Sequence, residues 1–144
     1  MATILEPGIF WVDIRLGVDK WVQDILARIP SSNPYTNLHV LKALAGGQAS
    51  LYYLSEEGEL TGFCVVRGME DASGKCLDIW VLYSDGKLDP MEAHSDFLDD
   101  MARSIGANRL RFSSSRLGWL RTAPKYRFKF KECIFEREVD YGRR

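Results

Sequence analysis

One stretch of the sequence, from residue 75 to residue 115, restricts the fold more than any other. Residues 76–83 read CLDIWVLY, an apolar run rich in β-branched and aromatic side chains with one interior charge, which predicts a central strand. The pair Asp85-Gly86 then predicts a tight turn, because glycine readily adopts the positive φ of a sharp reversal. An amphipathic helix and a second strand follow directly.

The helix is expected over residues 90–105. Asp89 is placed as its N-cap, Pro90 as its first residue and Glu92 in its first turn, where a negative charge is favourable. Gly106 follows as a left-handed C-cap. One face is expected to be buried, with His94 as a hydrogen-bonded core histidine, because apolar positions recur every three or four residues. These positions are Met91, His94, Phe97, Leu98, Met101, Ala102 and Ile105.

Residues 108–112 (NRLRF) alternate polar and apolar side chains and predict a strand. A strand that returns after a single helix is most simply a parallel neighbour, reached by a right-handed crossover. The stretch therefore predicts a βαβ unit within an α/β fold.

Further elements are expected on both sides of this unit. They are a strand at 8–13, a helix at 18–29, a short helix capped by Thr36 or Asn37 and running through Leu44, strands at 48–55 and 60–68 joined by a hairpin turn at 56–59, a turn at 71–74, a short helix at 117–121, a break at Pro124, and a last extended stretch at 126–139 with a bulge or a break between two strands near Lys131. We expect a mixed, mostly antiparallel sheet with helices on both faces, forming one domain over residues 1–144.

Composition excludes several classes of protein. With 46% hydrophobic and 27% charged residues, the chain has the profile of a folded globular protein. It has neither a basic start followed by an apolar run nor the roughly 20 apolar residues that span a bilayer, so we expect a cytoplasmic protein without a membrane partner. Three cysteines without a CxxC pair predict buried free thiols, and two histidines exclude a histidine-rich metal site.

Charge is distributed unevenly along the chain. Residues 1–100 contain 7 Lys and Arg against 16 Asp and Glu, whereas residues 101–131 contain 9 basic residues and no acidic one. This asymmetry predicts either a basic face that attracts nucleic acid, phosphates or an acidic partner, or ion pairs with the acidic first part of the fold.

Within the basic segment, Arg116, Trp119 and Arg121 form an R-x-x-W-x-R pattern, followed by Arg127 and Lys129. Aromatic and guanidinium groups are enriched at interface hot spots and also stack on bases. We therefore predict an interaction surface in this segment, with Trp119 partly exposed and with a protein partner or an oligomer contact favoured over nucleic acid.

The order of elements resembles the GNAT acetyltransferase superfamily and, more narrowly, the small acyltransferase-like proteins of tailed bacteriophages. The resemblance is carried by LTGFCVVRG, LDIWVLY, DDMARSIGANRLRFSSSR and RFKFKECIFEREV. It implies a GNAT-like α/β fold whose turn after the fourth strand holds the pyrophosphate of acetyl-CoA through backbone N–H groups. It places Leu82, Tyr83, Gly86 and Lys87 at the cofactor.

A catalytic carboxylate is the other component that such an enzyme needs. Asp78, on the expected central strand, is the candidate general base. The alternative for this residue is an ion pair with Arg67 or Lys75 on a solvated sheet face.

The sequence departs from the family at two places. The turn reads YSDGKLDP, with one glycine and with the carboxylates of Asp85 and Asp89 where the family places polyphosphate. In addition, Ala123 stands where the family often has a tyrosine that protonates the leaving thiolate, and Tyr126 is out of register.

Three hypotheses for function remain open. The first is a GNAT-fold protein with a degenerate acetyl-CoA site that acts as a non-catalytic interaction or virion-associated protein, in the host cytoplasm or the virion. The second is an active acetyl-CoA-dependent N-acyltransferase with an atypical turn. The third is a nucleic-acid- or phosphate-binding module that uses residues 101–131. The cofactor is accordingly either none or acetyl-CoA.

Overall fold

The computed structural model describes residues 7–28, 37–113, 118–131, 135, 137–139 and 142. Five strands form one sheet in the order β1-β2-β3-β4-β5. The elements are β1 (Pro7–Trp11), the 3-10 turn η1 (Ile14–Leu16), α1 (Lys20–Leu26), α2 (Asn37–Ala45), β2 (Ser50–Glu56), β3 (Glu59–Asp71), β4 (Gly74–Ser84), α3 (Pro90–Ala93), α4 (Ser95–Ser104), β5 (Arg109–Arg111), α5 (Trp119–Thr122) and the 3-10 turn η2 (Ala123–Tyr126).

The first four strands are antiparallel neighbours in chain order, and β5 returns parallel to β4. The βαβ unit is therefore confirmed. Glu57 and Gly58 connect β2 to β3 in the hairpin, and both have positive φ. Positive φ at both central residues is typical of the two-residue hairpin turn whose twist matches that of the strands. Residues 76–83 lie in β4, which is an interior strand with β3 on one side and β5 on the other, as predicted.

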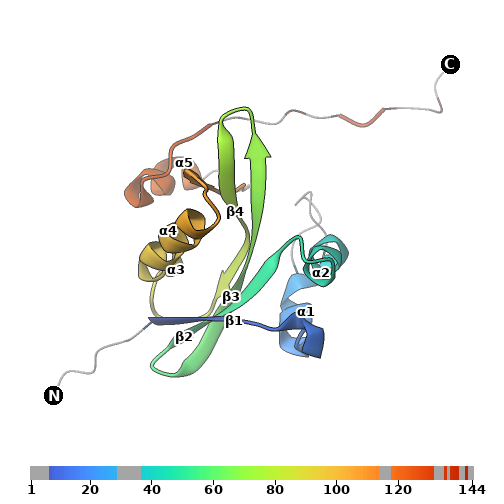
Figure 1. Ribbon diagram of the computed structural model, residues 1–144, viewed down its shortest axis with the longest axis vertical. Helices are drawn as coiled ribbons and strands as arrows, with labels where there is room; N and C mark the ends of the chain where they lie inside the picture. Colours follow the sequence, from blue (N-terminus) through green and yellow to red (C-terminus); the bar gives the residue numbers. More distant parts are fainter. Residues whose placement is uncertain are drawn as a thin grey trace.

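Helices cover both faces of the sheet (Figure 1). Helices α1 and α2 bury Val22, Leu26 and Leu44 against Phe63 and Val65 of the sheet. On the opposite face of the sheet, α3, α4 and α5 lie together, and their buried and partly buried side chains pack against that face. That core contains Leu54, Cys64, Val66, Leu77, Ile79, Met91, Leu98, Met101 and Ala102.

The helix expected over residues 90–105 is two helices with a break at His94. Asp89 caps α3 through a bond from the Met91 N–H, and Pro90 is the first helical residue, both as predicted. The backbone leaves helical geometry at His94 (φ −111°, ψ 14°), and helical hydrogen bonding resumes when Leu98 donates to the His94 carbonyl. Gly106 adopts the expected positive φ.

The last predicted strand, 126–139, is not formed in the residues that the structure describes. Tyr126 ends η2, Arg127 has a left-handed backbone (φ 67°), and residues 128–131 belong to no helix or strand. The α-helix α5 ends at Thr122, before Pro124, as predicted, and Pro124 itself lies at the start of the 3-10 turn η2, where a missing N–H costs nothing. The stretch instead packs through side chains, with the Phe128 ring 5.0 Å from that of Phe112.

Part of the predicted C-terminal strand lies outside the described residues, as do Arg116, Ser114, Ser115 and Cys133. The other two cysteines, Cys64 and Cys76, are buried free thiols, as expected. Within the described residues, no helix combines the length and the hydropathy needed to cross a bilayer.

Candidate functional site

The turn between β4 and α3, residues 85–89, is the place where the sequence predicted a bound polyphosphate. Two of its backbone N–H groups already have an anionic partner within the chain. Lys87 donates to one carboxylate oxygen of Glu56 at 3.0 Å, and Leu88 donates to the other at 2.9 Å. Glu56 is the last residue of β2 and is only 8% exposed. A buried carboxylate of the protein thus fills the concave side of this turn.

Gly86 is needed for this arrangement. A Cβ atom at this position would lie 2.3 Å from Oε1 and 2.7 Å from Cδ of Glu56, so a larger residue would push the carboxylate out of the turn. The Gly86 N–H is held by the Ser84 hydroxyl at 3.1 Å, and the Asp85 N–H by the Thr61 carbonyl at 2.8 Å. All four N–H groups from 85 to 88 are therefore used within the chain.

The N-terminus of α3 is also hydrogen-bonded within the chain. Asp89 accepts from the Met91 N–H with one oxygen at 3.0 Å and from the Tyr126 hydroxyl with the other. This bond to a carboxylate raises the pKa of Tyr126 above its usual value. Tyr126, which the sequence placed out of register, is thus tied to the helix cap and is not available as a free acid.

His94 lies between α3 and α4 and is buried, as expected. Burial lowers its pKa, and the nearby charge of Glu56 opposes that shift in part.

Leu82 and Tyr83 lie near the end of β4 with their side chains on opposite faces of the sheet. Leu82 packs at the margin of the α3–α4 core, and the Tyr83 ring lies 5.9 Å from that of Phe63 in the α1–α2 core. Of the four residues predicted at the cofactor, only Gly86 and Lys87 lie in the turn itself. Lys87 extends an exposed side chain beside it.

Asp78 is not an accessible base. Its side chain is 4% exposed and forms an ion pair with Arg67 at 2.8 Å and a second one with Arg111 at 3.5 Å. The guanidinium of Arg67 also lies 4.0 Å from the centre of the Trp80 ring. Pairing with Arg67, the alternative weighed from the sequence, is therefore confirmed, although the pair is buried and not on a solvated face.

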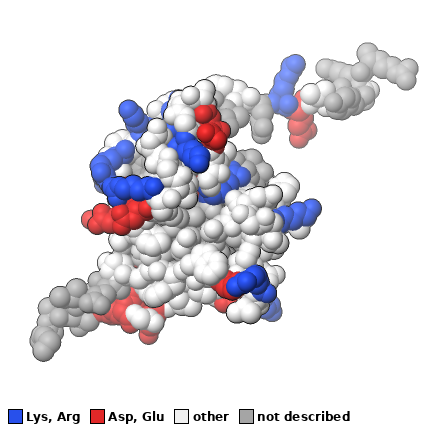
Figure 2. Space-filling view, in the orientation of Figure 1, with Lys and Arg blue, Asp and Glu red and all other residues white. Residues whose placement is uncertain are grey.

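The structure describes four of the five residues of the predicted interaction surface, all except Arg116. Trp119 is half-buried, with its ring 4.7 Å from that of Phe112, whereas Arg121, Lys129 and Arg127 are exposed. Arg127 pairs with Asp99 at 3.1 Å. Figure 2 shows basic side chains gathered over the region of α5 and the β3–β4 hairpin, with acidic ones among them.

Ion pairs account for much of the basic segment. Asp71 accepts hydrogen bonds from Arg109 at 2.7 Å and from the Ser73 N–H at 2.8 Å, and these bonds hold the pKa of Asp71 at about 2. Lys131 forms a further ion pair with Asp71 at 3.7 Å. Arg103, Arg111 and Arg127 are paired as well, so five of the eight basic residues that the structure describes in 101–131 have carboxylate partners. The ion-pair explanation of the charge asymmetry therefore holds for most of this segment.

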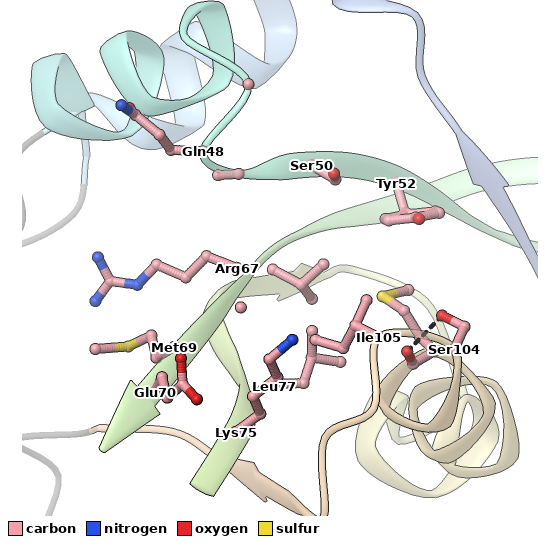
Figure 3. Close-up of a pocket in the computed structure, with 15 residues that line it drawn as sticks. Gln48, Ser50, Tyr52, Arg67, Met69, Glu70, Lys75, Leu77, Ser104 and Ile105 are labelled. Atoms are coloured by element: carbon pink, nitrogen blue, oxygen red, sulfur yellow. Dashed lines mark hydrogen bonds between the residues drawn. The ribbon is translucent and has the colours of Figure 1, made fainter. Parts of the chain in front are cut away.

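A groove of about 450 Å³ lies elsewhere, between the start of β2, the end of β3 and the C-terminal end of α4. Figure 3 shows Gln48 and Ser50 on one side and Lys75 and Leu77 on the other. None of the predicted cofactor residues, nor Asp78, lines this groove. The groove and the residues predicted at the cofactor therefore lie at different parts of the sheet.

Sequence reasoning missed Glu56 and the cap contact of Tyr126. Glu56 was assigned to the hairpin turn at 56–59, and nothing in the local pattern indicates that its side chain reaches a turn 31 residues away. The one available signal is the single glycine at 86, which allows close approach by another group.

With five strands, helices on both faces and the βαβ return, the protein has the GNAT acetyltransferase fold. No protein-family model matches the sequence, and no curated protein is similar at a significant level. Solved structures do match, at low sequence identity. A predicted acetyltransferase with acetyl-CoA from Clostridium acetobutylicum aligns with TM-score 0.64 and 13% identity, covering 92% of this chain and 96% of that one.

Two further structures agree with this assignment. Glucosamine-6-phosphate N-acetyltransferase from Arabidopsis thaliana aligns with TM-score 0.55 and 15% identity over 93% of this chain and 99% of that one. Ribosomal-protein-alanine N-acetyltransferase from Brucella melitensis aligns with TM-score 0.58 and 14% identity over 94% and 99%. Likeness at this level of identity establishes the fold and not the reaction.

Proposed function

We propose that this chain is a GNAT-fold protein that does not bind acetyl-CoA through the β4–α3 turn and acts through macromolecular contacts. The observation that carries the proposal is the Glu56 carboxylate bound to the N–H groups of Lys87 and Leu88. A pyrophosphate in the same place would have to displace a buried anion and would meet Asp85 and Asp89 as well, so like charges oppose it.

Two other observations support a non-catalytic role. Asp78 is committed to Arg67 and Arg111, and Tyr126 is bonded to Asp89, so neither is free to transfer a proton. The contact surface that we propose is formed by the exposed residues of α5 and the segment after it. Its exposed members are Leu120, Arg121, Lys125, Arg127, Lys129 and Phe130.

The resemblance of the sequence to small phage proteins supports a more specific role, as a component of a virion or of an assembly in the host cytoplasm. Mass spectrometry of purified particles from a phage that encodes this chain tests that role. Absence of the chain from the particles would remove the virion hypothesis and leave the host cytoplasm.

An active acyltransferase is the second candidate, and one observation favours it. β5 pairs with β4 only over Cys76–Asp78, so within the described residues the rest of β4 has no neighbour on that side. A ligand can approach such an edge through backbone groups. Nucleic-acid binding has less support, because five of the eight described basic residues in 101–131 are already paired.

Calorimetric titration of acetyl-CoA into the purified protein, with free CoA as the control, tests the proposal. We expect no saturable heat at millimolar ligand. Saturable micromolar binding that is lost in a Lys87→Glu variant would overturn the proposal and favour the acyltransferase. Binding that this variant retains would place the cofactor outside the turn.

A further inference from the structure

Strand β1 forms one edge of the sheet. In the strand order it has β2 on one side, and on the other side the described residues provide no neighbour (Figure 1). An edge strand presents a row of unpaired backbone N–H and C=O groups, which can pair with another chain.

The backbone groups that face outward can be assigned. Val12, which continues the β1 register, donates its N–H to the Leu51 carbonyl of β2 at 3.0 Å. Residues alternate in direction along an antiparallel strand, so Phe10 also faces β2, whereas Ile9 and Trp11 direct their N–H and C=O groups outward. Pro7 lies on the same outward side and presents a carbonyl only.

This edge carries none of the charges that commonly protect one. Residues 7–11 read PGIFW, whereas natural edge strands often carry lysine or other charges that prevent pairing. Phe10 is 55% exposed and Trp11 is 59% exposed. They lie on opposite faces of the strand, beside Tyr53 and Tyr52 respectively. Exposed aromatic side chains are enriched in protein interfaces.

We propose that β1 pairs antiparallel with β1 of a second copy of this chain, about a twofold axis at Ile9. In this register each Ile9 N–H donates to the partner's Ile9 carbonyl, and each Trp11 N–H donates to the partner's Pro7 carbonyl. Pro7 has no N–H, so the bond that would run from Pro7 to the partner's Trp11 carbonyl is absent at each end of the strand pair. The two five-stranded sheets then form one continuous sheet.

A second copy fits this edge better than an unrelated extended peptide, because the strand is uncharged from end to end and meets its own copy without like-charge repulsion. Among the residues that the structure describes, the charges nearest along the chain are Asp13 and Arg15, which are paired with each other at 2.7 Å. Because the axis is twofold, the β1 strands of both copies are paired by the same set of hydrogen bonds, and neither β1 is left free to pair with a third chain.

Sedimentation equilibrium of the full chain is the first test. We expect a mass twice the 16.4 kDa of one chain, and the mass of a monomer for Trp11→Lys, which places a charge on the edge. Leu38→Lys is the matched control, since Leu38 is 55% exposed on α2, and this variant should remain dimeric. A wild-type monomer, or a dimer lost in Leu38→Lys and kept in Trp11→Lys, would overturn the proposal.

Hydrogen exchange on the wild-type chain tests the register and does not require a variant to fold. Dilution from dimer to monomer should speed exchange at the Ile9 and Trp11 amides and leave Phe10 and Val12 unchanged, because only the first two face outward. Exchange at Ile9 and Trp11 that does not depend on concentration would rule out pairing through this edge. A monomer that instead binds an extended peptide along β1 would also refute self-pairing.

Discussion

At the scale of single residues, Glu56 decides what the β4–α3 turn can do. Backbone N–H groups at a turn before a helix attract anions, and in this protein the anion comes from the chain itself. Its carboxylate is bound at 2.9 and 3.0 Å and is nearly inaccessible to solvent. A buried carboxylate is expensive unless hydrogen-bonded, so the turn and Glu56 stabilise each other.

Replacing Glu56 by alanine should therefore lower the free energy of unfolding by about 2 kcal/mol, the scale of hydrogen bonds to a charged group. Urea denaturation followed by circular dichroism measures this loss. Glu70→Ala, at an exposed position of β3, is the control, and its effect should stay within about 0.5 kcal/mol. Equal effects of the two substitutions would mean that Glu56 does not support the turn.

At the scale of elements, β3 and β4 form the longest strand pair of the sheet, and a glycine sets how closely they approach. A Cβ atom at Gly62 would lie 1.9 Å from the Tyr83 carbonyl oxygen and 2.8 Å from the Ser84 Cα, both of which belong to backbone that cannot move aside. At Gly68, on the same strand, the nearest atom would be the end of the Ile105 side chain at 3.4 Å, which is ordinary contact.

Gly62→Ala should therefore destabilise the protein by about 3 kcal/mol, the upper part of the usual cost of overpacking. Gly68→Ala should be tolerated, with a change of less than about 1 kcal/mol, because the added methyl group meets only a side-chain end. Thermal unfolding of the two variants compares them directly. A Gly62→Ala variant as stable as Gly68→Ala would show that the pair of strands can separate locally at little cost.

At the scale of the whole molecule, buried charge links parts of the chain that are far apart in sequence. Asp78 of β4 binds Arg67 of β3 and Arg111 of β5, so one carboxylate joins three adjacent strands. The parallel pairing of β4 and β5 covers only three residues, and this ion pair reinforces it.

Asp78→Ala should cost about 3–5 kcal/mol, because it removes the carboxylate partner of two arginines, one of them with a side chain only 18% exposed. Asp100→Ala removes an exposed pair with Arg103, whose side chains are 74% and 71% exposed, and should change stability by less than about 1 kcal/mol. Chemical denaturation of both variants gives the comparison. A mild effect at Asp78 would mean that the strands are held by packing alone.

The sequence by itself determined the order of the elements as far as α5, the cap of α3 by Asp89, the positive φ of Gly106 and the parallel return of β5. Each of these depends on side-chain period or on turn chemistry within a few residues, which a linear pattern displays directly. The departure of the turn from the GNAT pattern was also visible, in its single glycine and its two carboxylates.

Only the tertiary structure decided what fills that turn and whether Asp78 is free. Glu56 and Lys87 are 31 positions apart, and Tyr126 and Asp89 are 37 apart, so packing and not local pattern brings them together. The same reason explains the error at residues 126–131. Their alternation of basic and aromatic residues favours a strand, but Tyr126 and Phe128 gain more from a hydrogen bond to Asp89 and from contact with Phe112 than from backbone pairing.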